Sequence, residues 1–197
     1  MNGKTHQLIG FTSSLAFATV IYSTSNVSLS ICATIIVGSC LGSYIPDMDH
    51  PGSTLGRKIG IISHPINLLS KLFASIHKKT KGKISLKLSE IFAHRGIFHA
   101  PIFWIVIMGL LFWKIPLLIS VEAVRNAIIG MLTGVGIGIG MHLFADMFNP
   151  TGIPILMPIF NKKLSLGRIV TGSKNEWVVL VFCLLIIACN VAFIFLQ

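Results

Sequence analysis

The residues best suited to chemistry in this 197-residue chain are its aspartates and histidines. His142 and Asp146 are four positions apart, so on a helix they project about 40° from one another and can reach one cation. Asp47 and Asp49 flank Met48 in the stretch PDMDHP, and two carboxylates so close together favour a cation between them. Imidazole and carboxylate together form the ligand set of zinc, manganese or iron.

A second stretch, HRGIFH at 94–99, adds His94 and His99 around Arg95. A guanidinium beside metal ligands can bind a phosphate oxygen with two hydrogen bonds, although Arg95 also fits a simple charged anchor at a membrane surface. Glu176, directly before Trp177, fits either a ligand or an acid that stabilises a helix N-terminus. Each of these motifs is weak alone, because turns and hydrogen-bonded pairs use the same residues.

The composition indicates a membrane protein. Hydrophobic residues make up 53% of the chain and charged residues only 11%, about half the charge that a soluble domain carries. Such hydrophobicity excludes a disordered chain. The four cysteines lie inside apolar runs without a CxxC pair, which excludes a disulfide-stapled secreted module.

Five segments have the length and apolar character of a transmembrane helix, so we predict one all-α, polytopic, membrane-embedded domain over residues 1–197. Fourteen lysines and arginines fall on one side of the predicted bilayer and two on the other. This imbalance predicts an inner-membrane protein with a cytoplasmic N-terminus, cytoplasmic long loops, an external C-terminus and contacts with anionic lipid. The predicted spans cover residues 8–22, 27–45, 97–119, 127–148 and 177–196.

The candidate ligands converge at one end of these spans. Neighbouring spans run antiparallel, so the start of an odd span and the end of an even span face the same side. Gly130, Gly134 and Gly138 precede His142 at a spacing that lets another helix approach closely. The polar residues that we expect at the cytoplasmic helix ends are His6, Asp47, Asp49, His50, His94, His99, His142, Asp146 and Glu176.

The basic loop at 46–96 contains apolar residues at helical spacing: Ile66, Leu69, Phe73 and Ile76. Lysines lie nearby, and we therefore predict an amphipathic helix lying on the membrane surface. The lysine-rich turn at 78–83 has no interleaved aromatic residues, so we expect no nucleic-acid partner.

Taken in order, these motifs resemble the YdjM-like family of membrane-bound, predicted metal-dependent hydrolases. The matching elements span nearly the whole chain: His6, PDMDHPGS at 46–53, HRGIFH at 94–99, HLFAD at 142–146 with Thr151-Gly152, and Gly172 with Glu176. That family is distantly similar to zinc-dependent phospholipase C and the zinc nucleases that cut single strands. The resemblance implies a phosphoesterase with two or three zinc ions, manganese being the alternative. The ligands that it implies are His6, Asp49, His94, His99, His142 and Asp146.

Hydrolysis of a lipid or prenyl phosphoester at the cytoplasmic membrane face is therefore our leading hypothesis. Asp47 or Glu176 would act as general base and Arg95 would bind the phosphate. Two other classes stay open. A metal transporter or sensor usually holds its ion near the bilayer midplane. A membrane scaffold would use a closed, four-coordinate structural metal site.

Overall fold

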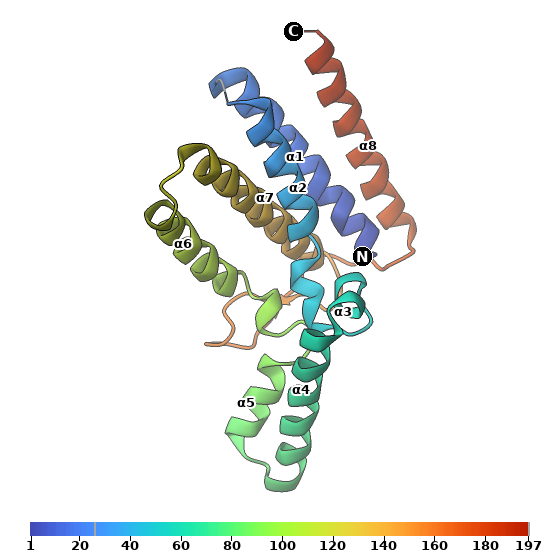
Figure 1. Cartoon of the computed structure of the whole chain (residues 1–197). Helices are drawn as coiled ribbons and strands as arrows, with labels where there is room; N and C mark the ends of the chain where they lie inside the picture. Colours follow the sequence, from blue (N-terminus) through green and yellow to red (C-terminus); the bar gives the residue numbers. More distant parts are fainter. Residues whose placement is uncertain (26, 197) are drawn as a thin grey trace.

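The computed structural model describes residues 1–25 and 27–196, and within them the chain is almost entirely helical (Figure 1). Five helical segments in this part are long and apolar enough to cross a membrane, which confirms the predicted all-α, polytopic fold. The segments are α1 (Gly3–Ser25), α2 (Leu29–Gly42) continued by the 3-10 turn η1 (Ile45–Asp49), α6 (Pro101–Leu118), α7 (Glu122–Met147) and α8 (Lys174–Phe195).

The helix boundaries differ from the predicted spans where polar residues continue a helix or a proline starts one. The first helix begins at Gly3, because its opening polar turn, including Thr5 and His6, is buried in protein instead of facing lipid. The third begins only at Pro101, a residue favoured at the first helical position. The preceding residues form a separate 3-10 turn, η2 (Ile97–His99).

Helices α2 and α7 pack backbone against backbone, as the glycine spacing predicted. A Cβ atom built on Gly134 or Gly138 would collide with the carbonyl oxygen of Ile35 or Ser39 on α2. A Cβ atom on Gly42 of α2 would likewise collide with the carbonyl oxygen of Val135 on α7. This close approach brings the end of α7, which carries His142 and Asp146, against the turn that follows α2.

The remaining spans pack around this pair. Helix α1 contacts both α2 and α7, and the Ser39 hydroxyl donates to the Gly10 carbonyl across 2.8 Å. Helix α8 packs on α1, and α6 packs on α7. Large apolar side chains of α6 and α8 such as Ile105 and Phe182 are exposed, as expected for faces that contact lipid.

Residues 54–91 form three helices at the end of the bundle: α3 (Thr54–Lys58), α4 (Gly60–Thr80) and α5 (Lys83–Ile91). Helix α4 contains the predicted amphipathic segment. It pairs with α5 as a hairpin, in which Phe73 stacks on Phe92 with ring centroids 6.1 Å apart. Figure 1 shows this hairpin projecting away from the spans, and the location of α4 at the membrane surface stays a prediction. Pairing with α5 covers part of the apolar face that was expected to meet lipid.

Two short contacts fix the loops near the candidate ligands. The Trp104 indole N–H donates to the Phe98 carbonyl over 2.7 Å, which ties η2 to the first turn of α6. After α7, the strand β1 (Ile153–Pro154) pairs antiparallel with β2 (Lys163–Leu164), with Ile153 opposite Leu164. Ile153 is fully buried against Trp104, so this hairpin packs beside the same turn.

Candidate metal centre

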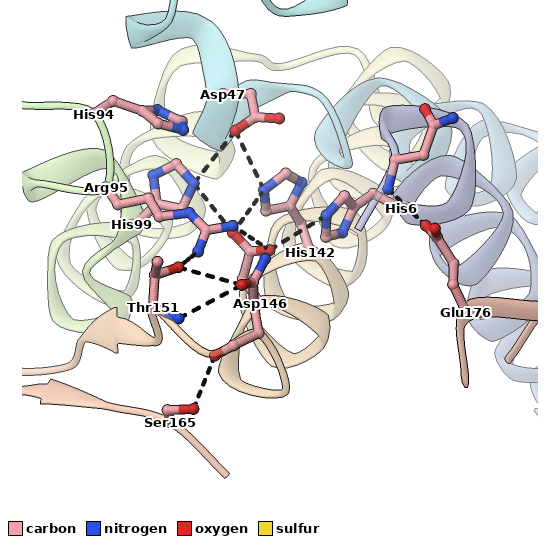
Figure 2. Close-up of polar contacts among 12 residues, drawn as sticks. His6, Asp47, His94, Arg95, His99, His142, Asp146, Thr151, Ser165 and Glu176 are labelled. Carbon is pink, nitrogen blue, oxygen red and sulfur yellow. Dashed lines mark hydrogen bonds and ion pairs between the residues drawn. The ribbon is translucent and has the colours of Figure 1, made fainter. Parts of the chain in front are cut away.

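Seven of the predicted residues meet in one cluster, hereafter the His/Asp cluster, and Figure 2 labels all of them except Asp49. Four chain segments supply them: the start of α1, the turn η1, the stretch before α6 and the last turns of α7. The potential ligands form three sets, of which the first and second share His142 and the second and third share His99. The members of the cluster are His6, Asp47, Asp49, His94, His99, His142 and Asp146.

The centre of the cluster is two imidazoles between two carboxylates. His99 Nε2 lies 3.4 Å from Asp47 Oδ1 and 3.5 Å from Asp146 Oδ2. For His142 Nε2 the same two distances are 3.7 and 3.8 Å. Two atoms bound to one tetrahedral zinc ion at about 2.0–2.1 Å lie about 3.3 Å apart. These nitrogen–oxygen separations are therefore slightly wider than those of ligands around a common ion.

The cluster continues in both directions from this centre. His6 Nε2 lies 3.4 Å from Asp146 Oδ1, and the His6 ring stacks on that of His142 with centroids 4.0 Å apart. On the other side, His94 Nδ1 lies 3.1 Å from Asp49 Oδ1. A 3-10 turn has about three residues per turn, so Asp47 and Asp49 leave η1 in different directions and serve different histidines.

His50, predicted at the same helix ends but not as a ligand, is a further candidate. Its ring lies 4.5 Å from that of His94, at the edge of the cluster. Its Nδ1 accepts the backbone N–H of Gly52 at 3.1 Å, which leaves Nε2 for another partner. In the sequence, only the position of His50 directly after Asp49 indicates a ligand, and a solvent-exposed turn can have the same order of residues.

The hydrogen bonding within the cluster fits a metal. Eight buried side-chain nitrogen or oxygen atoms in the described residues have no hydrogen-bond partner, and five of them belong to this cluster. Buried polar atoms are rarely left unpaired, because desolvation without a partner is unfavourable. Metal ions could bind the Asp49 oxygen and one nitrogen of each ring, because a neutral imidazole carries a lone pair on only one of its two nitrogens. The five atoms are His6 Nδ1, Asp49 Oδ2, both ring nitrogens of His99, and His142 Nε2.

The environment of His142 also suits a metal ligand. Its Nδ1 lies 2.7 Å from the Ser43 carbonyl oxygen, which can only accept a hydrogen bond, so the proton is on Nδ1. The lone pair is then on Nε2, the nitrogen that faces Asp47 and Asp146. Orientation of a ligating histidine by a backbone carbonyl is common in metal sites. The contact spans α7 and the end of α2, so it depends on the close glycine packing described above.

Arg95 lies against the cluster from a strained position. Its backbone has φ of 61°, a left-handed conformation that side-chain-bearing residues rarely adopt. Its Nη2 donates to Asp146 Oδ1 over 3.0 Å, and its Nη1 donates to the Thr151 hydroxyl. Such strain persists only where the surroundings enforce it, and it is concentrated at functional sites.

The members of the cluster differ in their exposure to solvent. The side chains of Asp49 and Asp146 are 0% and 2% exposed, whereas that of Asp47 is 28% exposed. His94 is also partly exposed, so the opening lies on the side of Asp47 and His94. Of the three carboxylates, Asp47 is the one that solvent can reach.

Glu176 does not join the cluster. One carboxylate oxygen accepts the backbone N–H of Asn2 at 2.7 Å and the Thr5 hydroxyl at 2.8 Å, and the other accepts the backbone N–H of Gly172 at 2.6 Å. It thus connects the start of α8 to the start of α1 (Figure 2). With both oxygens engaged in this way, Glu176 is positioned to join helices and not to act as the general base that the sequence suggested.

The fold and the His/Asp cluster define a multi-pass membrane protein with a candidate metal centre at one end of its spans. The chain belongs to the YdjM inner membrane protein family, whose family model matches residues 1–197. It is therefore a multi-pass inner membrane protein.

Individual relatives are more distant. The inner membrane proteins YdjM of Escherichia coli K12 and of Shigella flexneri are each 27% identical over 126 residues, which cover 63% of this chain and 49% of theirs. This chain therefore matches about half the length of these two relatives. The uncharacterized protein YvsG of Bacillus subtilis is 27% identical over 180 residues, covering 91% of this chain and 88% of that protein. No solved structure matches the chain.

Proposed function

We propose that this protein is a membrane-bound, metal-dependent phosphoesterase that hydrolyses a lipid phosphoester at the cytoplasmic membrane face. The observation that carries the proposal is the His/Asp cluster, with five buried atoms that lack a hydrogen-bond partner and an arginine at its edge. Zinc fits the mixture of imidazole and carboxylate ligands, and manganese is the alternative.

The number of ligands favours a catalytic centre over a structural one. A structural zinc site is closed and takes four ligands, whereas catalytic sites use about three protein ligands per ion. The six side chains other than Asp47 are enough for two ions at about three ligands each, and the partial exposure of Asp47 leaves a place for water or substrate. Two such ions would supply an acidified water as nucleophile and positive charge for the phosphate oxygens.

Three side chains would have the remaining roles in proton transfer, phosphate binding and ligand positioning. Asp47, the exposed carboxylate, is placed to orient a water and accept its proton. The Arg95 guanidinium can exchange its hydrogen bond to Thr151 for bonds to phosphate oxygens while it stays paired with Asp146. Asp146 would hold both Arg95 and His6, which couples the phosphate-binding group to the ligands.

The position of the cluster in the fold supports a lipid substrate over a transported ion. Transporter sites usually lie near the bilayer midplane at interrupted helices. Here the ligands lie at helix ends, where lipid headgroups are found. A phosphoester headgroup would reach this level without its hydrocarbon chains leaving the bilayer.

Metal content is the first test. Elemental analysis of the detergent-purified protein should find about two zinc or manganese ions per chain, and His142→Ala with Asp146→Asn should remove them. His64→Ala is the matched control, because His64 is an exposed histidine of α4 outside the cluster.

Turnover decides between the proposed enzyme and its rivals. The metal-loaded protein should hydrolyse a chromogenic phosphodiester or phosphatidic acid, and the double variant should not. One tightly held ion without turnover would indicate a structural site. Metal uptake by vesicles without turnover would indicate a transporter, and absence of metal under zinc and manganese loading would overturn the metal centre itself.

A further inference from the structure

An apolar cavity of about 280 Å³ lies between α1, α7 and α8, beside the His/Asp cluster and outside it. Its walls include Ile9 from α1, Met141 and Ala145 from α7, and Phe182 and Cys183 from α8. Thr12 and Ser13 supply hydroxyl groups. A buried water makes about three hydrogen bonds, and walls with so few polar groups hold water poorly. The cavity is therefore suited to hydrocarbon.

The cavity adjoins the metal ligands along the chain. Met141 and Ala145 directly precede His142 and Asp146, and Ile9 lies less than one helical turn after His6. The cavity thus lies beside the His6–His142–Asp146 end of the cluster. That is also the end at which Arg95 contacts Asp146.

From there the cavity extends toward the middle of the bilayer. Ser13, on its wall, is seven residues after His6, which corresponds to about 10 Å along α1. This is roughly a third of the hydrocarbon thickness of a bilayer, which is about 30 Å. A chain in the cavity would therefore run in the same direction as the neighbouring lipid chains.

The cavity also borders the surface that faces lipid. Phe144 of α7 and Phe182 of α8 belong to its walls, and both are at least half exposed. In a bilayer the phase next to these side chains is hydrocarbon. A lipid can therefore exchange with the cavity sideways between α7 and α8, without passing through water.

We propose that this cavity binds the upper part of the hydrocarbon chain of a lipid phosphoester whose phosphate lies at the His/Asp cluster. The inference rests on the proposed phosphoesterase function and adds the site that holds the hydrocarbon chain of the substrate, which enters from the bilayer. A water-soluble phosphoester would leave the cavity unused.

The kinetic test uses substitutions on α8, which lines the cavity but supplies no member of the cluster. Cys183→Phe places a larger side chain into the wall, and Val181→Phe adds the same ring on an exposed position of the same helix. For phosphatidic acid with long chains, kcat/KM of Cys183→Phe should fall at least tenfold, while a phosphoester with a two-carbon chain is hydrolysed as by the wild type. Val181→Phe should leave both rates unchanged. Equal rates for Cys183→Phe and the wild type on both substrates would overturn the inference and leave the phosphoesterase intact.

A second measurement does not depend on turnover or on one variant. Wild-type protein in nanodiscs is irradiated with phosphatidic acid that carries a diazirine in the upper part of its chain. Cross-links should be enriched in residues 141–148 and 179–186, and should decrease in Cys183→Phe but not in Val181→Phe. Cross-links spread evenly over the exposed faces of α6 and α8 would overturn the chain site. Cross-links in the cavity of a protein that hydrolyses no phosphoester would instead overturn the proposed function and, with it, the substrate role of the cavity.

Discussion

At the scale of single residues, the acidic groups near the membrane end have different roles because their partners differ. Asp47, Asp49 and Asp146 face imidazoles, whereas Glu176 accepts three hydrogen bonds from the backbone and a threonine. Sequence position alone does not separate them, because all four stand next to the end of a predicted span. The separation comes from which neighbouring segment each side chain meets.

Glu176→Gln should therefore reduce stability and not turnover. The amide nitrogen of glutamine would face a backbone N–H, so one donor would lose its acceptor, which costs about 1–3 kcal/mol when the donor is buried. Thermal unfolding in detergent should shift to lower temperature, while metal content and the kcat of the folded protein stay at wild-type level. A large loss of kcat with unchanged stability would restore Glu176 to the catalytic role that the sequence suggested.

Substitution of Arg95 should have the opposite effect, a loss of turnover without a loss of stability. Glycine adopts a φ of 61° without strain, so Arg95→Gly relaxes the backbone while it removes the guanidinium. We expect little change in thermal stability, retention of metal, and a fall in kcat/KM of roughly 100-fold, since removal of one group that stabilises developing charge typically costs that much. The kcat/KM of Arg95→Lys should lie between those of Arg95→Gly and the wild type, because an ammonium keeps the charge but not the paired hydrogen bonds. Wild-type turnover by Arg95→Gly would exclude a role in phosphate binding.

At the scale of helices, the pair α2 and α7 is the element on which the cluster depends. The glycine spacing predicted a close approach, and the structure confirms it at Gly134 and Gly138. The partner could not be predicted, because Gly38 and Gly42 on α2 are recognisable only once the two helices are aligned. The contact from His142 to the Ser43 carbonyl follows from that alignment.

Two glycines of α7 provide a matched test of this packing. A methyl group at Gly138 would collide with α2, whereas Gly140 has open space around it. Gly138→Ala should lower the unfolding temperature and the metal content, with an overpacking cost of about 1–3 kcal/mol. Gly140→Ala should be neutral or slightly stabilising, because alanine favours helix by about 1 kcal/mol over glycine. The same behaviour in both variants would contradict a close α2–α7 contact as the support of the centre.

The sequence predicted most of the fold and most of the candidate centre, for identifiable reasons. Long apolar segments and HxxxD at a helix end depend on local spacing, which a single sequence displays. The hairpin of α4 and α5 depends on which partner covers an amphipathic face, and Phe92, which packs on Phe73, lies outside the predicted helix. The apolar cavity was not predicted, since three separate helices form it.

At the scale of the whole molecule, the cluster and most of the positive charge lie at the same end of the helix bundle. In Figure 1 the N-terminus lies near the cluster end of the bundle and the C-terminus at the opposite end. Fourteen of the sixteen lysines and arginines also fall on the cluster side of the predicted topology. Positive charge is retained on the cytoplasmic side of bacterial inner membranes, so we expect the centre to face the cytoplasm.

Reporter fusions test this orientation. Alkaline phosphatase fused after residue 197 should be active, because it folds outside the cytoplasm, and a fluorescent protein at the same position should be dark. The same two reporters inserted between α4 and α5 should give the opposite result. Matching signals at both positions would contradict a five-span topology.

The order in which the ligands occur along the chain has a consequence for biosynthesis. His6 emerges from the ribosome first and Asp146 last, with most of the chain between them, and no single span carries more than two members of the cluster. The centre is therefore complete only when α7 has been synthesised and has docked on α2. If the centre binds metal as proposed, metal loading would be a late step of biosynthesis. Helix α8 is synthesised after α7, and its Glu176 then accepts hydrogen bonds from Asn2 and Thr5 at the start of α1.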